Sequence, residues 1–147
     1  MKTEIVRAHA ADYAEVLALL SEVNLPPEGV QEHLSEFLVA RDAVGKLVGC
    51  VGQERYGHVA LLRSLAVKPW RQGNGLGREM ILELLSDARA SGVNELVLLT
   101  TTAADFFQRH FGFEPVERQR YDAALEDSPE WKLPRCSSAV CLALRLV

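Results

Sequence analysis

One strand–loop–helix unit in the middle of the chain constrains the fold more than any other feature. Val59–Val67 is a long apolar run interrupted only by Arg63 and Ser64, which predicts a strand buried on both faces. Apolar residues then recur at helical spacing over Gly75–Ser91, which predicts an amphipathic helix. A short apolar run at Leu96–Leu99 predicts a second strand, parallel to the first and reached by a right-handed crossover.

Shorter patterns predict the remaining elements of a mixed α/β fold. We expect strands at Thr3–Ala8, Phe37–Arg41, Leu47–Gln53, Phe113–Val116 and Ser138–Leu146, and helices at Ala11–Glu22, Glu28–His33 and Ala103–His110. A turn at residues 42–46 makes a hairpin of the strands beside it. Arg118–Arg135 is polar and contains two prolines, so it is predicted to be a loop with at most one helical turn.

Composition limits the class of protein. The 147 residues suit a single domain spanning residues 1–147, and 48% hydrophobic content is enough for a buried core. A net charge of −4 without a basic stripe disfavours nucleic acid as a partner. Neither a signal peptide nor an apolar run of the ~18 residues that span a membrane is visible, so we expect a cytoplasmic chain.

The cysteines and histidines carry no recognisable chemistry. Cys50, Cys136 and Cys141 are odd in number and widely spaced, which argues against a disulfide framework. The four histidines are scattered, and no pair of ligands has the short spacing of a zinc site. We therefore expect no metal centre.

The loop between the central strand and its helix has the composition of an anion-binding site. Gly73, Gly75 and Gly77 leave backbone N–H groups unobstructed, and the helix directs its own free N–H groups toward the same place. Arg71 and Arg78 add positive charge nearby. The loop lacks the Gly-Lys-Ser/Thr of a Walker motif and the spacing of a dinucleotide fingerprint. A tight turn without a ligand is the alternative interpretation.

Two motifs resemble those of GNAT acyltransferases. Gln72-x-x-Gly75-x-Gly77, preceded by Leu65-Ala66-Val67-x-Pro69, is similar to the coenzyme A motif of that superfamily, and residues 106–113 are similar to its late helix ending in Gly-Phe. The resemblance implies a central mixed, mostly antiparallel sheet that splays around the cofactor and is flanked by helices. It implies acetyl-CoA as co-substrate, attacked directly by an amine in a ternary complex. The cofactor residues that it implies are Leu65, Ala66, Val67, Gln72, Gly73, Asn74, Gly75, Leu76, Gly77, Arg78, Phe106, Phe107 and Arg109.

A narrower resemblance concerns the acceptor. Leu61–Val67, Leu98–Ala103 and Trp131–Val140 resemble ArsN-type acetyltransferases of arsenic-resistance operons. Those enzymes are thought to acetylate amino acids or amino-acid-like toxins. Similar patterns occur in amino-acid N-acetyltransferases related to N-acetylglutamate synthases. The resemblance implies a small amino-acid-like amine as acceptor, with a homodimer as an open alternative to a monomer.

The family's usual acid and base have no counterparts here. Many relatives carry a Glu on the strand before the loop and a Tyr on the late helix, but the matching positions hold Leu61 and the pair Phe106-Phe107. Glu54 and Tyr56 are the candidate substitutes, and the alternative for each is a solvated surface group. This departure leaves two other hypotheses open, a catalytically degenerate acyl-CoA-binding module and a protein-acetylating enzyme.

Arg63 is the main candidate for acceptor binding. Strand alternation places it on the same face as Leu61 and Leu65, where its guanidinium could bind an acceptor carboxylate. The alternative is a structural ion pair with an acidic residue, since a buried arginine is costly unless paired. Further acceptor candidates are Thr100, which could instead cap the following helix, together with Cys136 and Ser137, whose alternative is a packed thiol and a strand cap.

Overall fold

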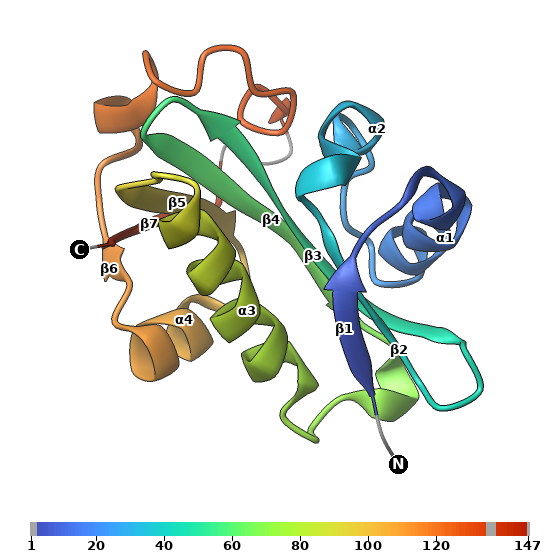
Figure 1. Ribbon diagram of the computed structural model, residues 1–147. Helices are drawn as coiled ribbons and strands as arrows, with labels where there is room; N and C mark the ends of the chain where they lie inside the picture. Colours follow the sequence, from blue (N-terminus) through green and yellow to red (C-terminus); the bar gives the residue numbers. More distant parts are fainter. Residues whose placement is uncertain (1–2, 135–137, 147) are drawn as a thin grey trace. The chain divides into compact units, whose positions relative to one another are not determined.

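The computed structural model describes residues 3–134 and 138–146 and contains a seven-stranded sheet in this part of the chain (Figure 1). The strands are β1 (Glu4–Arg7), β2 (Leu38–Arg41), β3 (Leu47–Tyr56), β4 (Val59–Val67), β5 (Glu95–Thr100), β6 (Glu114–Pro115) and β7 (Val140–Arg145), in the order β1-β2-β3-β4-β5-β7-β6. The α-helices are α1 (Tyr13–Glu22), α2 (Val30–His33), α3 (Leu76–Ala90) and α4 (Ala104–Phe111). The mixed fold is as the sequence predicted, and the mostly antiparallel sheet is as the resemblance to GNAT acyltransferases implied.

The chain divides into two compact units, and β3, β4 and α3 contribute residues to both. The first unit comprises residues 1–53 and 64–86, and the second comprises residues 54–63 and 87–147. The glycine loop belongs to the first unit, whereas Glu54, Arg63 and α4 belong to the second. The two groups of candidate residues are therefore described separately.

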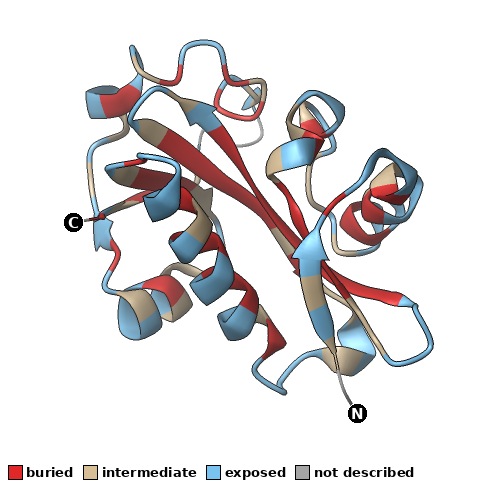
Figure 2. Cartoon of the chain, viewed as in Figure 1, coloured by how far each residue is buried: buried red, intermediate tan, exposed pale blue. Residues whose placement is uncertain are grey.

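The first unit is built on an antiparallel ladder that one amphipathic helix covers. β1 pairs with β2 and β2 pairs with β3, with Val39 opposite Cys50. Helix α1 places its apolar side on these strands, and Figure 2 shows the buried positions. This core contains Ala8, Val16, Leu19, Leu20, Val30, Leu34, Phe37, Val39, Leu47, Cys50 and Ala66.

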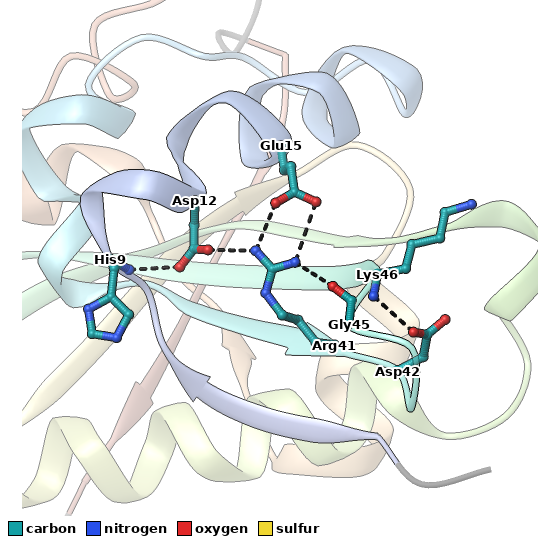
Figure 3. A network of polar contacts seen from close by, with 7 residues as sticks. All are labelled: His9, Asp12, Glu15, Arg41, Asp42, Gly45 and Lys46. Carbon is teal, nitrogen blue, oxygen red and sulfur yellow. Dashed lines mark hydrogen bonds and ion pairs between the residues drawn. The ribbon is translucent and has the colours of Figure 1, made fainter.

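A charged network fixes the start of α1 to the β2–β3 hairpin (Figure 3). The Arg41 guanidinium lies 2.6 Å from an Asp12 oxygen and 2.8 Å from a Glu15 oxygen, and it donates to the Gly45 carbonyl at 2.7 Å. The other Asp12 oxygen accepts the His9 backbone N–H at 2.8 Å, which supports the first turn of the helix. Burial alone would raise the pKa of Asp12, but the His9 and Arg41 hydrogen bonds outweigh it and lower that pKa.

The second unit contains the parallel pair that the sequence predicted. β4 pairs in parallel with β5 over Val59–Leu61 and Glu95–Val97, while β4 itself continues to Val67. β5 is antiparallel to β7, which in turn pairs with the short β6. The segment at residues 118–134 packs on one face of these strands, and its core contains Leu61, Val97, Tyr121, Leu125, Trp131 and Cys141.

Most element bounds differ by a few residues from those predicted, and those of β3, β6 and α1 are among them. β3 runs on past the predicted end at Gln53 to Tyr56, and Glu54 in this extension is buried and paired with Arg63. β6 covers only Glu114–Pro115, since Phe113 packs against Phe107. A 3-10 turn at Ala10–Asp12 precedes α1. No helix in the described part of the chain is long and apolar enough to cross a membrane.

We expect Gly52→Ala to destabilise the first unit, because a Cβ at Gly52 would stand 2.2 Å from the fully buried Phe37 ring. Overpacking of this kind costs about 1–3 kcal/mol. Chemical denaturation would measure the loss. Gly77→Ala is the control, since its Cβ would come no closer than 4.0 Å to Val67. Equal stability of both variants would contradict this account of Gly52.

Candidate functional site

β4 is distorted just before the residues implied to contact the cofactor. Ser64 has a φ of 62°, a left-handed conformation that is rare for a residue with a side chain. It is buried, and its carbonyl accepts a hydrogen bond from the Cys50 thiol at 3.3 Å. A left-handed residue interrupts strand alternation, so the expectation that Arg63 and Leu65 share a face does not carry across Ser64.

The loop after β4 requires glycine at two positions. Gly73 and Gly75 have φ values of 86° and 81°, which side chains disfavour. No atom of the described residues lies within 4 Å of where a Cβ would stand on either glycine. Glycine is therefore required at both positions by the backbone conformation. The absence of side chains there also leaves the backbone of the loop accessible. The Gln72 amide group donates to the Val67 carbonyl at 3.0 Å and ties the loop to the end of β4.

Helix α3 begins directly after this loop, at Leu76. Its first turn is closed by the Glu79 N–H, which donates to the Gly75 carbonyl at 3.1 Å. The N–H groups that precede Glu79 have no partner within the helix by its geometry, and the helix dipole makes this end positive. Leu76 itself is buried, whereas Asn74 and Arg78 are exposed. This end of α3 can hold an anion.

Cationic side chains around the loop are held by partners on the first unit. Arg71 donates to the Thr3 hydroxyl at 2.8 Å, and Lys68 lies 2.9 Å from a Glu22 carboxylate oxygen. Trp70 is 55% exposed, and the Lys46 ammonium lies 5.8 Å from its ring centroid. Arg71 is thus fixed to the N-terminal segment rather than aimed freely at the loop.

Arg63 is the centre of a buried polar cluster in the second unit. Its Nη1 lies 2.7 Å from a Glu54 oxygen, and both side chains have 0% exposure. The other Glu54 oxygen accepts the Tyr56 hydroxyl at 2.5 Å. The ion-pair alternative for Arg63 is therefore present, and an acceptor carboxylate would have to displace an existing partner. The surface-group alternative for Glu54 is wrong, since this carboxylate is buried.

Tyr56 is held in its protonated form. Burial raises the pKa of its hydroxyl, and the hydrogen bond to Glu54 raises that pKa further. Its side chain is only partly buried. Tyr56 can therefore orient Glu54 but cannot act as a base near neutral pH.

A second carboxylate, which sequence reasoning missed, reaches Arg63 from residues 118–134. Glu130 Oε2 lies 3.8 Å from Arg63 Nε, and its side chain is 10% exposed. The neighbouring Trp131 is buried and donates its indole N–H to Asp122 at 3.0 Å. The only signal in the sequence is indirect: a buried arginine needs acids, and Glu130 adjoins a large aromatic residue that anchors its segment.

α4 is an aromatic helix rather than a polar catalytic one. Phe107 is buried, with its ring 5.2 Å from Phe106 and 5.4 Å from Phe113 between centroids. Arg109 is exposed and pairs with Asp105 at 3.7 Å. The structure therefore places apolar surface, and no tyrosine, where many relatives carry a proton donor.

The remaining acceptor candidates divide into one that is described and two that are not. The Thr100 hydroxyl oxygen accepts the Ala103 backbone N–H at 2.9 Å, which is the helix-capping alternative for this residue. Cys136 and Ser137 lie outside the described residues.

The buried pair should contribute strongly to folding. We expect Arg63→Met to lower the free energy of unfolding by about 3–5 kcal/mol, because it leaves Glu54 buried without its cation. Adding Glu54→Leu should recover part of that loss. Arg109→Met, at an exposed pair, is the control and should leave the denaturation midpoint unchanged. An unchanged midpoint for Arg63→Met would contradict a structural role of the pair.

Sequence comparison relates the chain to N-acetyltransferases. It is 33% identical over 95 residues to an uncharacterized N-acetyltransferase of Chlorobaculum tepidum, covering 64% of this chain and 59% of that protein. It is 34% identical over 102 residues to an amino-acid acetyltransferase of Mycobacterium tuberculosis, covering 67% and 56%. The chain thus spans less than two thirds of the length of these relatives.

Solved structures agree on the fold. An N-acetylglutamate synthase from Neisseria gonorrhoeae, complexed with coenzyme A and L-arginine, superposes with a TM-score of 0.78 at 25% identity over 98% of this chain and 33% of that one. A Mycobacterium tuberculosis protein in complex with CoA and NLQ gives 0.78 at 26% identity, over 98% and 99%. The family model for the acetyltransferase (GNAT) domain matches residues 33–115, more than half of the 147 residues, and the chain belongs to the GNAT family.

Proposed function

We propose that this chain is an acetyl-CoA-dependent N-acetyltransferase that acts on a small amino-acid-like amine. The observation that carries the proposal is the loop in which left-handed Gly73 and Gly75 lead into the N-terminus of α3. Coenzyme A was present in two of the structures similar to this chain, and one relative is an amino-acid acetyltransferase. Together these favour an enzyme over a module that only binds acyl-CoA.

The loop fits the pyrophosphate of coenzyme A. The open space beside Gly73 and Gly75 would admit the phosphates to the backbone, and α3 would supply N–H donors from Leu76, Gly77 and Arg78. In the first unit, the resemblance implies that the pantetheine lies along Leu65, Ala66 and Val67 at the end of β4. In the second unit, Phe106 and Phe107 form an aromatic pair on α4. The cofactor supplies an activated acetyl group as a thioester.

The amine would attack the thioester carbon directly, without an acyl-enzyme. This route requires the protein to orient the amine, accept its proton and stabilise the developing oxyanion. The left-handed backbone at Ser64 precedes the residues where that oxygen is expected, and strain of this kind is characteristic of functional sites.

The acceptor class rests on the resemblances and not on Arg63. Since Arg63 already binds Glu54, a free arginine that selects acidic acceptors is no longer the simplest interpretation. ArsN-type acetyltransferases and amino-acid acetyltransferases share an amino-acid-like amine as acceptor. A test panel should therefore include neutral, acidic and basic amino acids and arsenic-containing amino-acid analogues.

We expect the wild-type chain to release free coenzyme A thiol from acetyl-CoA when a member of this panel is present. The thiol assay should be paired with mass spectrometry of the acceptor, which should gain one acetyl group. Binding of acetyl-CoA without turnover on any acceptor would support the degenerate module instead. Acetylation of protein lysines alone would support a protein-acetylating enzyme.

We expect Gly75→Glu to abolish acetyl-CoA binding, because the new carboxylate would occupy and repel the pyrophosphate position. Isothermal calorimetry on the folded variant would measure the affinity. Gly45→Glu is a matched control, since Gly45 has a φ of 83°, has open space and lies in the β2–β3 turn. Loss of affinity in both variants would mean that strain or charge in general, and not this site, is responsible.

A further inference from the structure

We propose that Gly49 of β3 is a positioning residue for acetyl-CoA, because the absence of a side chain there sets how closely the start of α3 approaches the end of β4. The inference rests on the proposed acetyl-CoA-dependent function and adds to it a residue outside the glycine loop. Gly49, the end of β4 and the start of α3 all belong to the first unit.

The backbone conformation of Gly49 does not itself require glycine. Gly49 is buried inside β3, and it is not one of the glycines that have a positive φ. Most side chains favour a strand more than glycine does, so glycine weakens the strand at this position. A glycine inside a strand often marks a place where another part of the backbone approaches closely. The reason for this glycine therefore lies in its surroundings.

Two elements implied to hold the cofactor approach the bare side of Gly49. A Cβ at this position would stand 3.3 Å from the Ala66 carbonyl oxygen of β4 and 3.4 Å from the Leu76 Cδ2 of α3. It would also stand 3.0 Å from the sulfur of Met80, one turn further along α3. These separations are tighter than a Cβ normally has, so a neighbour would have to move. Ala66 and Leu76 are both residues that the resemblance implies for the cofactor.

The end of β4 is held against β3 on both sides of Ala66. The Lys68 N–H donates to the Val48 carbonyl at 2.9 Å, and the Cys50 thiol donates to the Ser64 carbonyl at 3.3 Å. The Ala66 side chain is itself buried in the core that α1 covers. Because hydrogen bonds and packing fix this part of β4, volume added at the glycine would displace α3 instead.

The start of α3 is the part that yields. Leu76 and Met80 hold it to the sheet through buried apolar side chains, and apolar packing has no fixed direction. Leu76 is the first residue of the helix and directly follows the left-handed Gly75. A displacement of this turn would therefore move the loop backbone and the N–H groups of the helix together. Binding groups must be held within about 0.5 Å of their productive geometry, so a small displacement weakens the cofactor site.

The test is a size series at Gly49, with acetyl-CoA affinity measured by isothermal calorimetry. We expect Gly49→Ala to lower the affinity about 3-fold and Gly49→Val about 10-fold or more, since a misplacement of about 1 Å can cost as much as 10²-fold. Circular dichroism and chemical denaturation would establish that each variant is folded. If Gly49→Val does not fold, Gly49→Ala decides the test.

Gly52→Ala is the matched control, three residues along the same strand. The atoms nearest to a Cβ at Gly52 all belong to the Phe37 ring, which is not implied to contact the cofactor. We expect this variant to lose at least as much stability as Gly49→Ala and to bind acetyl-CoA with wild-type affinity. A merely structural role of Gly49 would instead make affinity follow stability in both variants.

Three results would each overturn the inference. They are wild-type affinity in the folded Gly49 variants, a loss of affinity in Gly52→Ala as large as in Gly49→Ala, and failure of both Gly49 variants to fold. The proposed function survives any of these results while the wild type binds acetyl-CoA and acetylates an acceptor. Absence of acetyl-CoA binding by the wild type would refute the proposed function, and the inference with it.

Discussion

Burial of the Arg63 guanidinium inside β4 is the constraint around which the second unit is organised. A charge with no exposure is tolerated only when carboxylates surround it, because desolvation costs several kcal/mol per ion. Glu54 comes from the neighbouring strand, and Glu130 comes from a segment more than sixty residues later. One side chain thus joins three parts of the chain. An apolar residue at position 63 would fill the same space without specifying which segment lies over the strand.

The residues of β4 before Ser64 belong to the second unit, and those from Ser64 onward belong to the first. Before Ser64, Leu61 packs in the apolar core of the second unit and Arg63 forms the buried ion pair with Glu54. After it, Ala66 packs in the core of the first unit, and the strand leads into the glycine loop. The left-handed backbone at Ser64 marks this change and is held by burial and by the Cys50 thiol. A left-handed residue within a strand interrupts the regular alternation of side chains between its two faces, so the faces of β4 before and after Ser64 are not related by strand periodicity.

The helices and strands could be predicted from local sequence patterns, because the formation of each depends mainly on the residues within it. The bounds of β4 and the parallel pairing with β5 followed from apolar runs, and the glycine loop followed from backbone chemistry. The cluster around Arg63 was not predictable to the same degree. The predicted strand ended at Gln53, so Glu54 was expected to be a catalytic substitute or a solvated surface group, and nothing near Glu130 in sequence indicates Arg63 as its partner. Such pairings depend on tertiary contacts between distant segments, which periodicity does not record.

The chemistry of the leaving group explains why α4 can do without a tyrosine. A thiol has a pKa near 8.5, so a thiolate departs from carbon without needing a proton in advance. An amine faces the opposite problem, since it is mostly an unreactive ammonium ion near neutral pH. Acetyl transfer to an amine therefore depends more on a proton acceptor than on a proton donor. With Phe106 and Phe107 in place of a tyrosine, α4 lacks a proton donor that the leaving thiolate does not need, and the two rings pack against each other.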